Sequence, residues 1–152
     1  MDFNLYSEKE IAVFNGVISL MEKGINPYSI KVSDIAKEAD VGKGTIYDYF
    51  NSKEEAIAQA IIYNTKGEMD AIYLRVRKEE GFKNKFYEIL RIFTEYVDNN
   101  VSTLTTLLSV GGTRKFYEYL SDYECDLAQH IFRINDLFEH LLETGVEERI
   151  IS

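Results

Sequence analysis

Two short segments with helical spacing of apolar residues, Val32–Ala39 and Lys43–Phe50, are separated by only three residues. The chain must turn sharply at Asp40, and Asp adopts the left-handed backbone conformation more readily than most residues. Gly42 can serve as the N-cap of the second segment, where Gly costs only about a few tenths of a kcal/mol relative to Ser. The pattern therefore predicts a helix-turn-helix.

Helical patterning extends over nearly the whole chain, and no segment shows strand alternation. Ser7 and Glu10 have the spacing of a capping box, so a first helix should begin there, and Gly24 should end it. Ser52 should cap a long fourth helix that reaches the Glu80-Gly81 region.

Further helices are expected after this point. The pattern predicts one over Phe82–Asn99, with Phe86, Leu90, Phe93 and Val97 on one stripe, and a short one over Val101–Val110. A last helical segment should run from about Thr113 or Arg114 to Glu143, either unbroken or with a break near Asp122, and end at Thr144-Gly145.

The length of 152 residues fits one domain, or a small head joined to a larger body, and 45% hydrophobic residues suffice for a core. We expect an all-α fold in which residues 1–52 form a helix-turn-helix domain. Residues 53–152 should form a helical ligand-binding or regulatory domain.

The composition excludes several classes of protein. The apolar runs are too short to span a membrane, and the first residues lack the basic and apolar regions of a signal peptide. A single cysteine, Cys125, excludes an internal disulfide and fits a reducing, cytoplasmic location. We expect Cys125 to be a small buried side chain rather than a redox sensor.

The net charge of −9 is unfavourable for a nucleic-acid binder. Residues 25–53, however, contain four Lys and four acidic residues and are neutral. Affinity for phosphate depends on local cations, so a neutral head can bind DNA, although its non-specific binding should be weak.

The segment Lys43–Phe50 should present one face to the core and one outward. Ile46, Tyr49 and Phe50 have i, i+3, i+4 spacing and are expected to face inward. The remaining side chains are left for solvent or DNA: Lys43, Gly44, Thr45, Tyr47 and Asp48.

The chemistry of this outward set suits DNA. Lys43 can pair with a phosphate or a guanine edge, and Gly44 allows close approach of the backbone. Thr45 can bond a phosphate or touch a thymine methyl, and the Tyr47 hydroxyl can reach a phosphate. Asp48 can accept from cytosine or stay in water.

Other residues can hold phosphates beside this face. Lys53 adds a cation and free backbone amides at the start of the fourth helix. Lys31 and Ser33, at the start of the second helix, can do the same.

Several motifs of this region match a known pattern. They are the first-helix spacing from Ile11-Ala12 through Phe14 to Gly24, then Asp34-Ile35-Ala36, Ala39, Val41, Gly44-Thr45-Ile46-Tyr47, Tyr49-Phe50 and Ser52-Lys53-Glu54. Over about its first third the chain closely resembles the N-terminal domain of the tetracycline-repressor (TetR) family of bacterial regulators. The run GTIYDYFNSKEE, residues 44–55, is highly specific for that family.

The resemblance implies a homodimeric repressor that binds a palindromic double-stranded DNA operator. It implies release of the operator when a small effector binds the C-terminal helices and moves the fourth helix. It implies no cofactor and no membrane partner.

The chain departs from the family pattern in four places. The family often has Gly at Asp40, Ser at Gly42 and Thr near Lys31, and these changes together suggest an unusual operator. Members also commonly continue past a segment like Leu141–Glu148 into two more helices that form the dimer interface. Because this chain stops at Ser152, we favour a truncated sequence.

The C-terminal half is rich in aromatic residues, which at helical spacing usually belong to a core. Because the family binds ligands there, we also expect a pocket. Its candidate lining residues are Phe86, Phe93, Tyr96, Leu107, Phe116, Tyr119 and Tyr123.

Two alternatives stay open at this point. Asp126 with His130, and Asp136 with His140, have metal-ligand spacing, but two ligands are too few and exposed ion pairs are favoured. No nucleophile–base pair or phosphate loop suggests an enzyme. The alternative function is a helical interaction module that keeps the fold without binding DNA.

Overall fold

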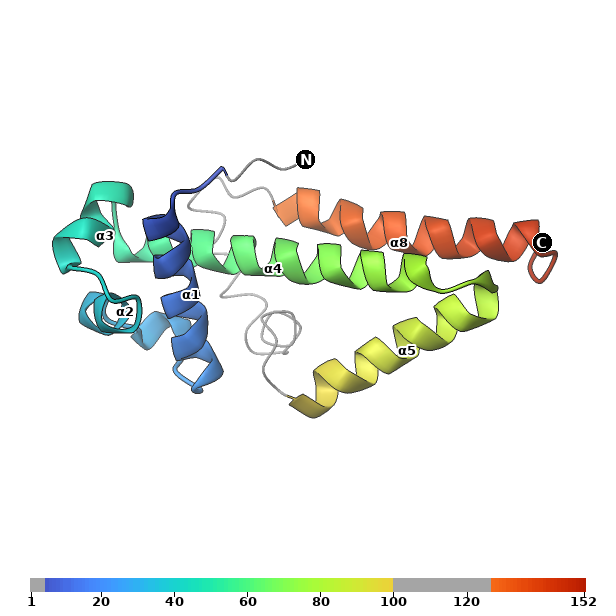
Figure 1. Ribbon diagram of the computed structural model, residues 1–152, viewed down its shortest axis with the longest axis horizontal. Helices are drawn as coiled ribbons and strands as arrows, with labels where there is room; N and C mark the ends of the chain where they lie inside the picture. The colour runs from blue at the N-terminus through green and yellow to red at the C-terminus, as the bar shows by residue number, and fades with distance from the viewer. Residues whose placement is uncertain (1–4, 100–126) are drawn as a thin grey trace. The chain divides into compact units, whose positions relative to one another are not determined.

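The computed structural model describes residues 5–99 and 127–152, and side chains over residues 5–98 and 134–152 (Figure 1). In these ranges the chain is all-α, which confirms the predicted fold class. The elements are α1 (Glu8–Glu22), the 3₁₀ helix η1 (Pro27–Ser29), α2 (Val32–Glu38), α3 (Lys43–Tyr49), α4 (Lys53–Lys78), α5 (Gly81–Asn99) and α8 (Leu127–Glu147). The predicted helix Val101–Val110 and Cys125 lie outside the described residues.

The described residues form two compact units. Unit 1 comprises residues 5–64, and unit 2 comprises residues 65–99 and 127–152. Helix α4 therefore contributes its first turns to unit 1 and its later turns to unit 2. None of the described helices combines the length and the apolar character that crossing a membrane requires.

Helix α1 of unit 1 begins and ends where local signals predict. The Ser7 N–H donates to Glu10 Oε2 (2.7 Å) and the Glu10 N–H donates to Ser7 Oγ (3.3 Å), which confirms the capping box. At the other end Gly24 has φ +86°, and the Ile25 N–H donates to the Leu20 carbonyl (3.2 Å). This is a Schellman motif, so Gly24 ends the helix as predicted.

The core of unit 1 is tightly closed. Phe14, Ile35 and Ile46, from three different helices, are fully buried. Gly16 allows α1 and the end of α2 to approach each other, because a Cβ at Gly16 would lie 3.1 Å from the Cβ of Ala39. The short helix α2 is thereby held against α1.

A polar contact also joins α1 to α2. Lys23 Nζ lies 2.6 Å from Glu38 Oε1, and the Ser19 hydroxyl donates to the same oxygen. The hydrogen bonds from Lys23 and then Ser19 lower the pKa of the Glu38 carboxyl. The contact therefore strengthens with the ionisation of Glu38.

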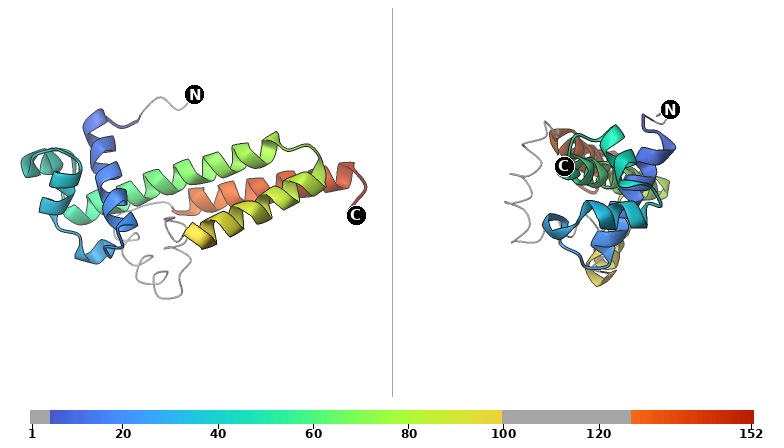
Figure 2. Two further views of the ribbon diagram at one scale, coloured as in Figure 1. Left: turned by 60° about the horizontal axis from the view of Figure 1, so that its bottom comes forward. Right: turned by 90° about the vertical axis from the view of Figure 1, so that its left-hand side faces the viewer.

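Unit 2 is built from the later turns of α4 and from α5 and α8, and α8 packs on α5, as the left view of Figure 2 shows. Its core cluster combines residues of all three helices, with Tyr73, Phe82 and Tyr96 packed against it. The buried members are Met69, Ile72, Val76, Ile89, Ile92, Leu137 and Leu141.

Two charged side chains satisfy helix ends in unit 2. Lys85, only 6% exposed, donates from Nζ to carbonyls at the end of α4, the shortest contact being 2.6 Å to the Glu79 oxygen. The Glu148 carboxylate accepts from the Phe82 N–H (3.1 and 3.2 Å) at the start of α5. Each charge has the sign that its helix dipole favours.

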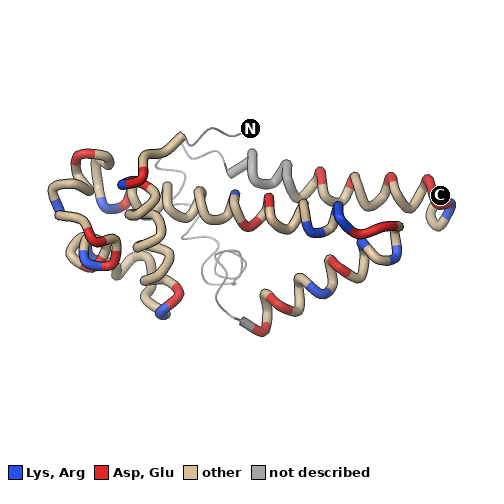
Figure 3. Tube along the Cα trace, viewed as in Figure 1, with Lys and Arg blue, Asp and Glu red and all other residues tan. Residues whose placement is uncertain are grey.

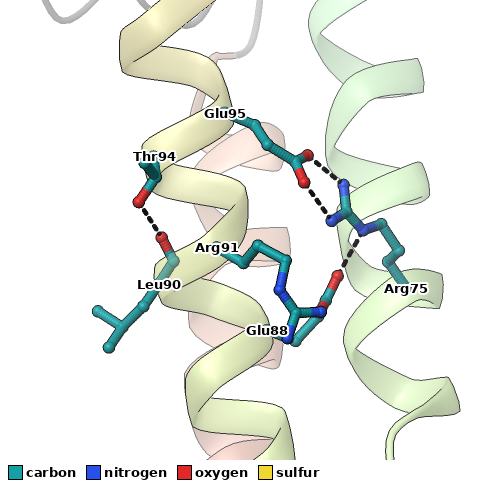
Figure 4. A network of polar contacts seen from close by, with 6 residues as sticks. All are labelled: Arg75, Glu88, Leu90, Arg91, Thr94 and Glu95. Atoms are coloured by element: carbon teal, nitrogen blue, oxygen red, sulfur yellow. Dashed lines mark hydrogen bonds and ion pairs between the residues drawn. The ribbon is translucent and has the colours of Figure 1, made fainter.

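An ion-pair network fastens α4 to α5 (Figure 4). Arg75 Nε lies 2.6 Å from Glu88 Oε1, and its two terminal nitrogens lie 2.7 and 3.0 Å from the Glu95 oxygens. Arg91 also pairs with Glu88, which is 4% exposed. The bonds with Glu95 raise the pKa of Arg75 and lower the pKa of Glu95. The bidentate geometry makes this pair stronger than an ordinary surface ion pair.

The prediction that Thr144-Gly145 ends the last helix is wrong, because α8 continues to Glu147. The Thr144 hydroxyl bonds the His140 carbonyl (2.8 Å) within the helix. Gly145 is a packing residue: a Cβ there would lie 2.8 Å from Cδ2 of Phe82 and 2.8 Å from Cδ1 of Ile151. The helix stops later, where Arg149 has φ +57°.

Unit 2 also exposes two apolar stripes. The predicted stripe of α5 lies on one face of that helix, and the structure shows that this face is exposed. We call it the α5 stripe, and its residues are Phe86 (43%), Leu90 (46%), Phe93 (57%) and Val97 (66%). The α8 stripe consists of Ile134 (36%), Phe138 (47%), Leu142 (53%) and Val146 (54%).

Candidate nucleic-acid interface

The turn between α2 and α3 has the geometry of a helix-turn-helix. Asp40 adopts φ +54°, and the Val41 N–H donates to the Ala36 carbonyl (3.0 Å), as in a Schellman motif. Gly42 is the N-cap of α3 in an extended conformation (φ −72°, ψ 152°). Both turn predictions are confirmed, and α2 and α3 pack against each other and against α1.

One side of α3 has no packing role among the described residues. Lys43, Gly44, Tyr47 and Asp48 are exposed and follow one another around the helix at i, i+1, i+4, i+5, while Ile46 is fully buried. We call these four residues the outer face of α3. A Cβ on Gly44 would meet nothing within 4 Å, so no described neighbour requires a glycine there.

Two residues beside the outer face, Thr45 and Tyr49, lie differently from their predicted positions. Thr45 is half-buried, and its hydroxyl lies 3.7 Å from where a Cβ of Gly42 would be. Tyr49 was predicted to face inward, and this is wrong, because it is 41% exposed. A helix as short as α3 has a narrow buried arc, which Ile46 and the C-cap residue Phe50 (2% exposed) occupy.

The start of α2 carries the two further predicted residues of this region. Lys31 is exposed at the N-cap position, and no side chain caps the helix there. Ser33 is half-buried in the first turn. Acidic and basic positions are interspersed over unit 1 (Figure 3). The lysines of this surface are therefore single positive charges among acidic residues, in line with the neutral net charge of residues 25–53.

The start of α4 differs from its prediction. Ser52 does cap the helix, since its hydroxyl accepts from the Glu55 N–H (3.0 Å). The Glu55 carboxylate in turn accepts from the Asn51 N–H (2.6 Å), and Lys53 Nζ lies 3.5 Å from Glu54 Oε1. These amides and this cation are therefore already engaged by protein groups, which makes the site less suited to a phosphate.

The sequence patterns did not single out two exposed tyrosines of unit 1. Tyr28 (42% exposed) lies on η1, where its N–H donates to Asn26 Oδ1 (2.9 Å), and Tyr49 lies at the end of α3. In the sequence, Asn26-Pro27 marks the turn in which Tyr28 lies. For Tyr49 no local signal exists.

The predicted pocket residues fall into three groups: exposed, packed against the core, and outside the described residues. Phe86 and Phe93 lie on the exposed α5 stripe, whereas Tyr96 packs against the core cluster and burial raises its pKa. Leu107, Phe116, Tyr119 and Tyr123 lie outside the described residues. The pocket stays a prediction.

Metal binding has no support among the described residues, where no group of three or more candidate ligands occurs. His140 instead packs near the ring of Tyr73, with 6.4 Å between ring centroids. Burial, followed by the charges of Lys85 and Arg77, lowers the pKa of His140, so it is neutral at pH 7. Asp126 and His130 lie outside the described side chains.

The geometry so far is a three-helix unit with an exposed, mixed-polarity face on the helix after the turn. Residues 20–60, from the end of α1 to the first turns of α4, match the family model of the bacterial regulatory proteins of the tetR family. This segment of the chain is a tetR-family domain. This confirms the resemblance drawn from the motifs, and it makes the protein a TetR-type DNA-binding regulator. No curated protein and no solved structure matches the chain.

Proposed function

We propose that this TetR-family protein is a ligand-responsive transcriptional repressor that binds a palindromic operator as a homodimer in the cytoplasm. The outer face of α3 is the observation that carries the proposal. Four residues lie exposed on a helix positioned by the turn at Asp40, and none of them serves the core. A surface of this kind fits the major groove.

Within this proposal the outer face supplies the base contacts. Lys43 and Asp48 present a donor and an acceptor to base edges, and Gly44 lets the backbone approach them. Tyr47 contacts a phosphate through its hydroxyl, and Lys31, Ser33 and Thr45 add phosphate contacts beside it. In a homodimer two such faces would meet half-sites ~34 Å apart, or a multiple of that distance.

We assign Lys53 a smaller role than the other lysines. Its ammonium already lies near Glu54, and Glu55 adds a second carboxylate to the same turn. A phosphate there would meet two negative charges, so Lys53→Ala should weaken binding less than Lys43→Ala does.

A mobility-shift titration with the DNA upstream of the gene tests the proposal. Lys43→Ala and Tyr47→Ala should each weaken the shift, Lys43→Ala by ~10-fold or more if it contacts a base. Lys9→Ala is the matched control, because Lys9 is an exposed lysine at the start of α1. Equal affinities for all four proteins would place the DNA contacts elsewhere.

The alternative is a helical interaction module without DNA binding. The neutral head and the carboxylates at the start of α4 favour it. Absence of any shift at low salt, with a chain that remains folded, would establish this alternative and overturn the repressor proposal.

The effector is proposed to bind among the helices of unit 2 and to shift the population of two positions of α4. Tyr96 is the described candidate for a polar contact with it, because it is half-buried beside the core cluster. The Tyr96 hydroxyl suits an aromatic or amphipathic effector better than an alkane.

A further inference from the structure

Asp48 lies on the outer face of α3 at a position where helix chemistry disfavours it. It precedes the last residue of α3, in a final turn that contains no basic side chain. The partial negative charge at the C-terminal end of a helix repels a carboxylate there. Asp48 is also exposed, and it forms no hydrogen bond or ion pair with the described residues. No contact in the described part of the chain therefore accounts for this carboxylate.

Gly44 is a second residue of the outer face that the described fold does not require. A Cβ there would meet nothing within 4 Å, and glycine makes a helix less stable than alanine does. Gly44 precedes Asp48 by four residues, so the two lie on the same side of α3, one turn apart. A helical side chain leans toward the turn before its own Cα. The short Asp48 carboxylate is thus left uncovered where the backbone of α3 can come closest to another molecule.

The chemistry of a carboxylate restricts which base edge it can meet. An ionised Asp accepts hydrogen bonds and donates none. In the major groove, guanine presents two acceptors, and thymine presents an acceptor and a methyl group. Adenine presents a donor beside an acceptor, whereas cytosine presents only the donor of its N4 amino group. Cytosine is therefore the base that an Asp side chain fits best.

We propose that Asp48 selects a cytosine in each half-site of the operator, by accepting a hydrogen bond from the N4 amino group. The proposal rests on the DNA binding of the proposed function and names a base that α3 requires. The same carboxylate is repelled by the acceptors of other bases and by phosphates, so it weakens binding to sequences that lack the cytosine. Residues that a fold does not itself favour are expected at functional sites, and Asp48 and Gly44 are two such residues one turn apart.

Lys43 gives the position of this cytosine along the groove. It lies on the same outer face, five residues before Asp48, and it is the lysine that can contact a guanine edge. With α3 lying along the groove, five helical residues span ~7.5 Å, which is about two base-pair steps of ~3.4 Å. A guanine read by Lys43 and the cytosine read by Asp48 should therefore lie about two base pairs apart.

Selection of bound duplexes from a randomised pool tests the proposal with the full chain. The wild-type protein should select cytosine at one position of each half-site. Asp48→Ala should lose the preference at that position and keep the preferences elsewhere. Asp48→Asn should shift it from cytosine to adenine, because an Asn amide pairs with both N6 and N7 of adenine.

Glu22→Gln is the matched control for Asp48→Asn. Glu22 is an exposed acidic residue at the end of α1, so the substitution removes the same charge from a similar position in another helix. It should leave the base preference unchanged. Thermal unfolding should show that Asp48→Asn is no less stable than the wild type, because it removes a carboxylate from a helix C-terminus.

Single-base changes in the selected duplex measure the contact by mobility shift. Replacing the selected C·G pair by G·C should weaken wild-type binding by at least ~5-fold, the lower limit for a direct base contact. The same change should weaken Asp48→Ala binding much less, because the interacting side chain is already absent. Equal losses for the two proteins would place Asp48 away from the bases and overturn the proposal. So would a uniform gain in affinity for Asp48→Ala with an unchanged base preference.

Failure of this proposal differs from failure of the proposed function. A wild-type chain that shifts DNA but selects another base at the Asp48-dependent position, or shows no such position, overturns the cytosine assignment and keeps DNA binding. A folded chain that shifts no DNA from the upstream region at low salt overturns both.

Discussion

Unit 1 and unit 2 bury their large apolar side chains to different degrees. In unit 1, Phe14 and Ile46 are fully buried, and the large apolar side chains exposed from α1 to α3 are tyrosines, which also carry a hydroxyl. In unit 2, Phe93 and Leu142 are more than half exposed, while charged Lys85 and Glu88 are among the buried residues. Within the described residues, the large apolar side chains of α1 to α3 are mostly buried, whereas α5 and α8 each keep an exposed apolar stripe.

The difference reflects how many sides of each helix have a partner. Helix α1 packs against both α2 and α3, and these close the core together with the start of α4. In unit 2 the helices α5 and α8 pack on each other and on α4, and their other faces meet nothing described. A DNA-binding unit needs a free polar face, whereas the exposed α5 and α8 stripes of unit 2 are apolar.

The largest expected effect comes from comparing two phenylalanines, one in each unit. Phe50→Ala in unit 1 should lower the free energy of unfolding by ~3–5 kcal/mol, since the ring is 2% exposed and its removal leaves a cavity. Phe93→Ala in unit 2, where the ring is 57% exposed, should cost less than ~1 kcal/mol in the monomer. Urea unfolding at low protein concentration measures both, and equal losses would remove the contrast.

Alanine substitutions at two glycines should change the free energy of unfolding by smaller amounts and in opposite directions. Gly145→Ala should cost ~1–3 kcal/mol, because its Cβ would lie 2.8 Å from Phe82 and Ile151. Gly44→Ala should stabilise the fold by up to ~1 kcal/mol, because its Cβ would meet nothing within 4 Å and alanine favours a helix.

The Gly44→Ala variant also tests whether the outer face of α3 contacts DNA. If the backbone at Gly44 approaches DNA, Gly44→Ala should weaken the mobility shift although it stabilises the fold. Thermal unfolding and DNA titration of the one variant separate these effects. A tighter or unchanged shift would show that a methyl group fits beside the DNA.

The smallest predicted effect is the pH dependence that His140 brings to unit 2. Its pKa in the folded chain lies below its ordinary value of 6.5, so the unfolded chain binds the proton more tightly. The free energy of unfolding is therefore largest above pH 6.5 and declines as the pH falls through and below that value. Urea unfolding between pH 7.5 and 5.5 should show the decline, and His140→Gln should reduce it. An unchanged slope in the variant would assign the effect to another group.

Local features of the fold were predictable from neighbouring residues. The capping box of Ser7 with Glu10, the left-handed turn at Asp40 and the Ser52 cap all depend on atoms within a few residues along the chain. The hydrogen bonds and backbone angles involved are set by short-range chemistry. For the same reason the outer face of α3 could be placed from spacing alone, apart from Tyr49, which is exposed, and Thr45, which is half-buried.

Features that depend on distant partners were not predictable in this way. Gly145 has the sequence signature of a helix stop, yet it serves the contact with Phe82, which lies far away in the chain. The spacing of the α5 stripe shows that its residues share a face, but not whether another helix covers that face. Lys85 and Glu88 are buried only because α4 supplies carbonyls to one and Arg75 to the other.

The amino-acid sequence by itself determined that this protein is helical, where the helices of its helix-turn-helix start and stop, and which side chains of α3, apart from Thr45 and Tyr49, lie on its outer face. Tertiary structure alone decided which apolar faces are covered. Burial is a property of the neighbours that a face meets, and helical periodicity specifies the face without specifying those neighbours.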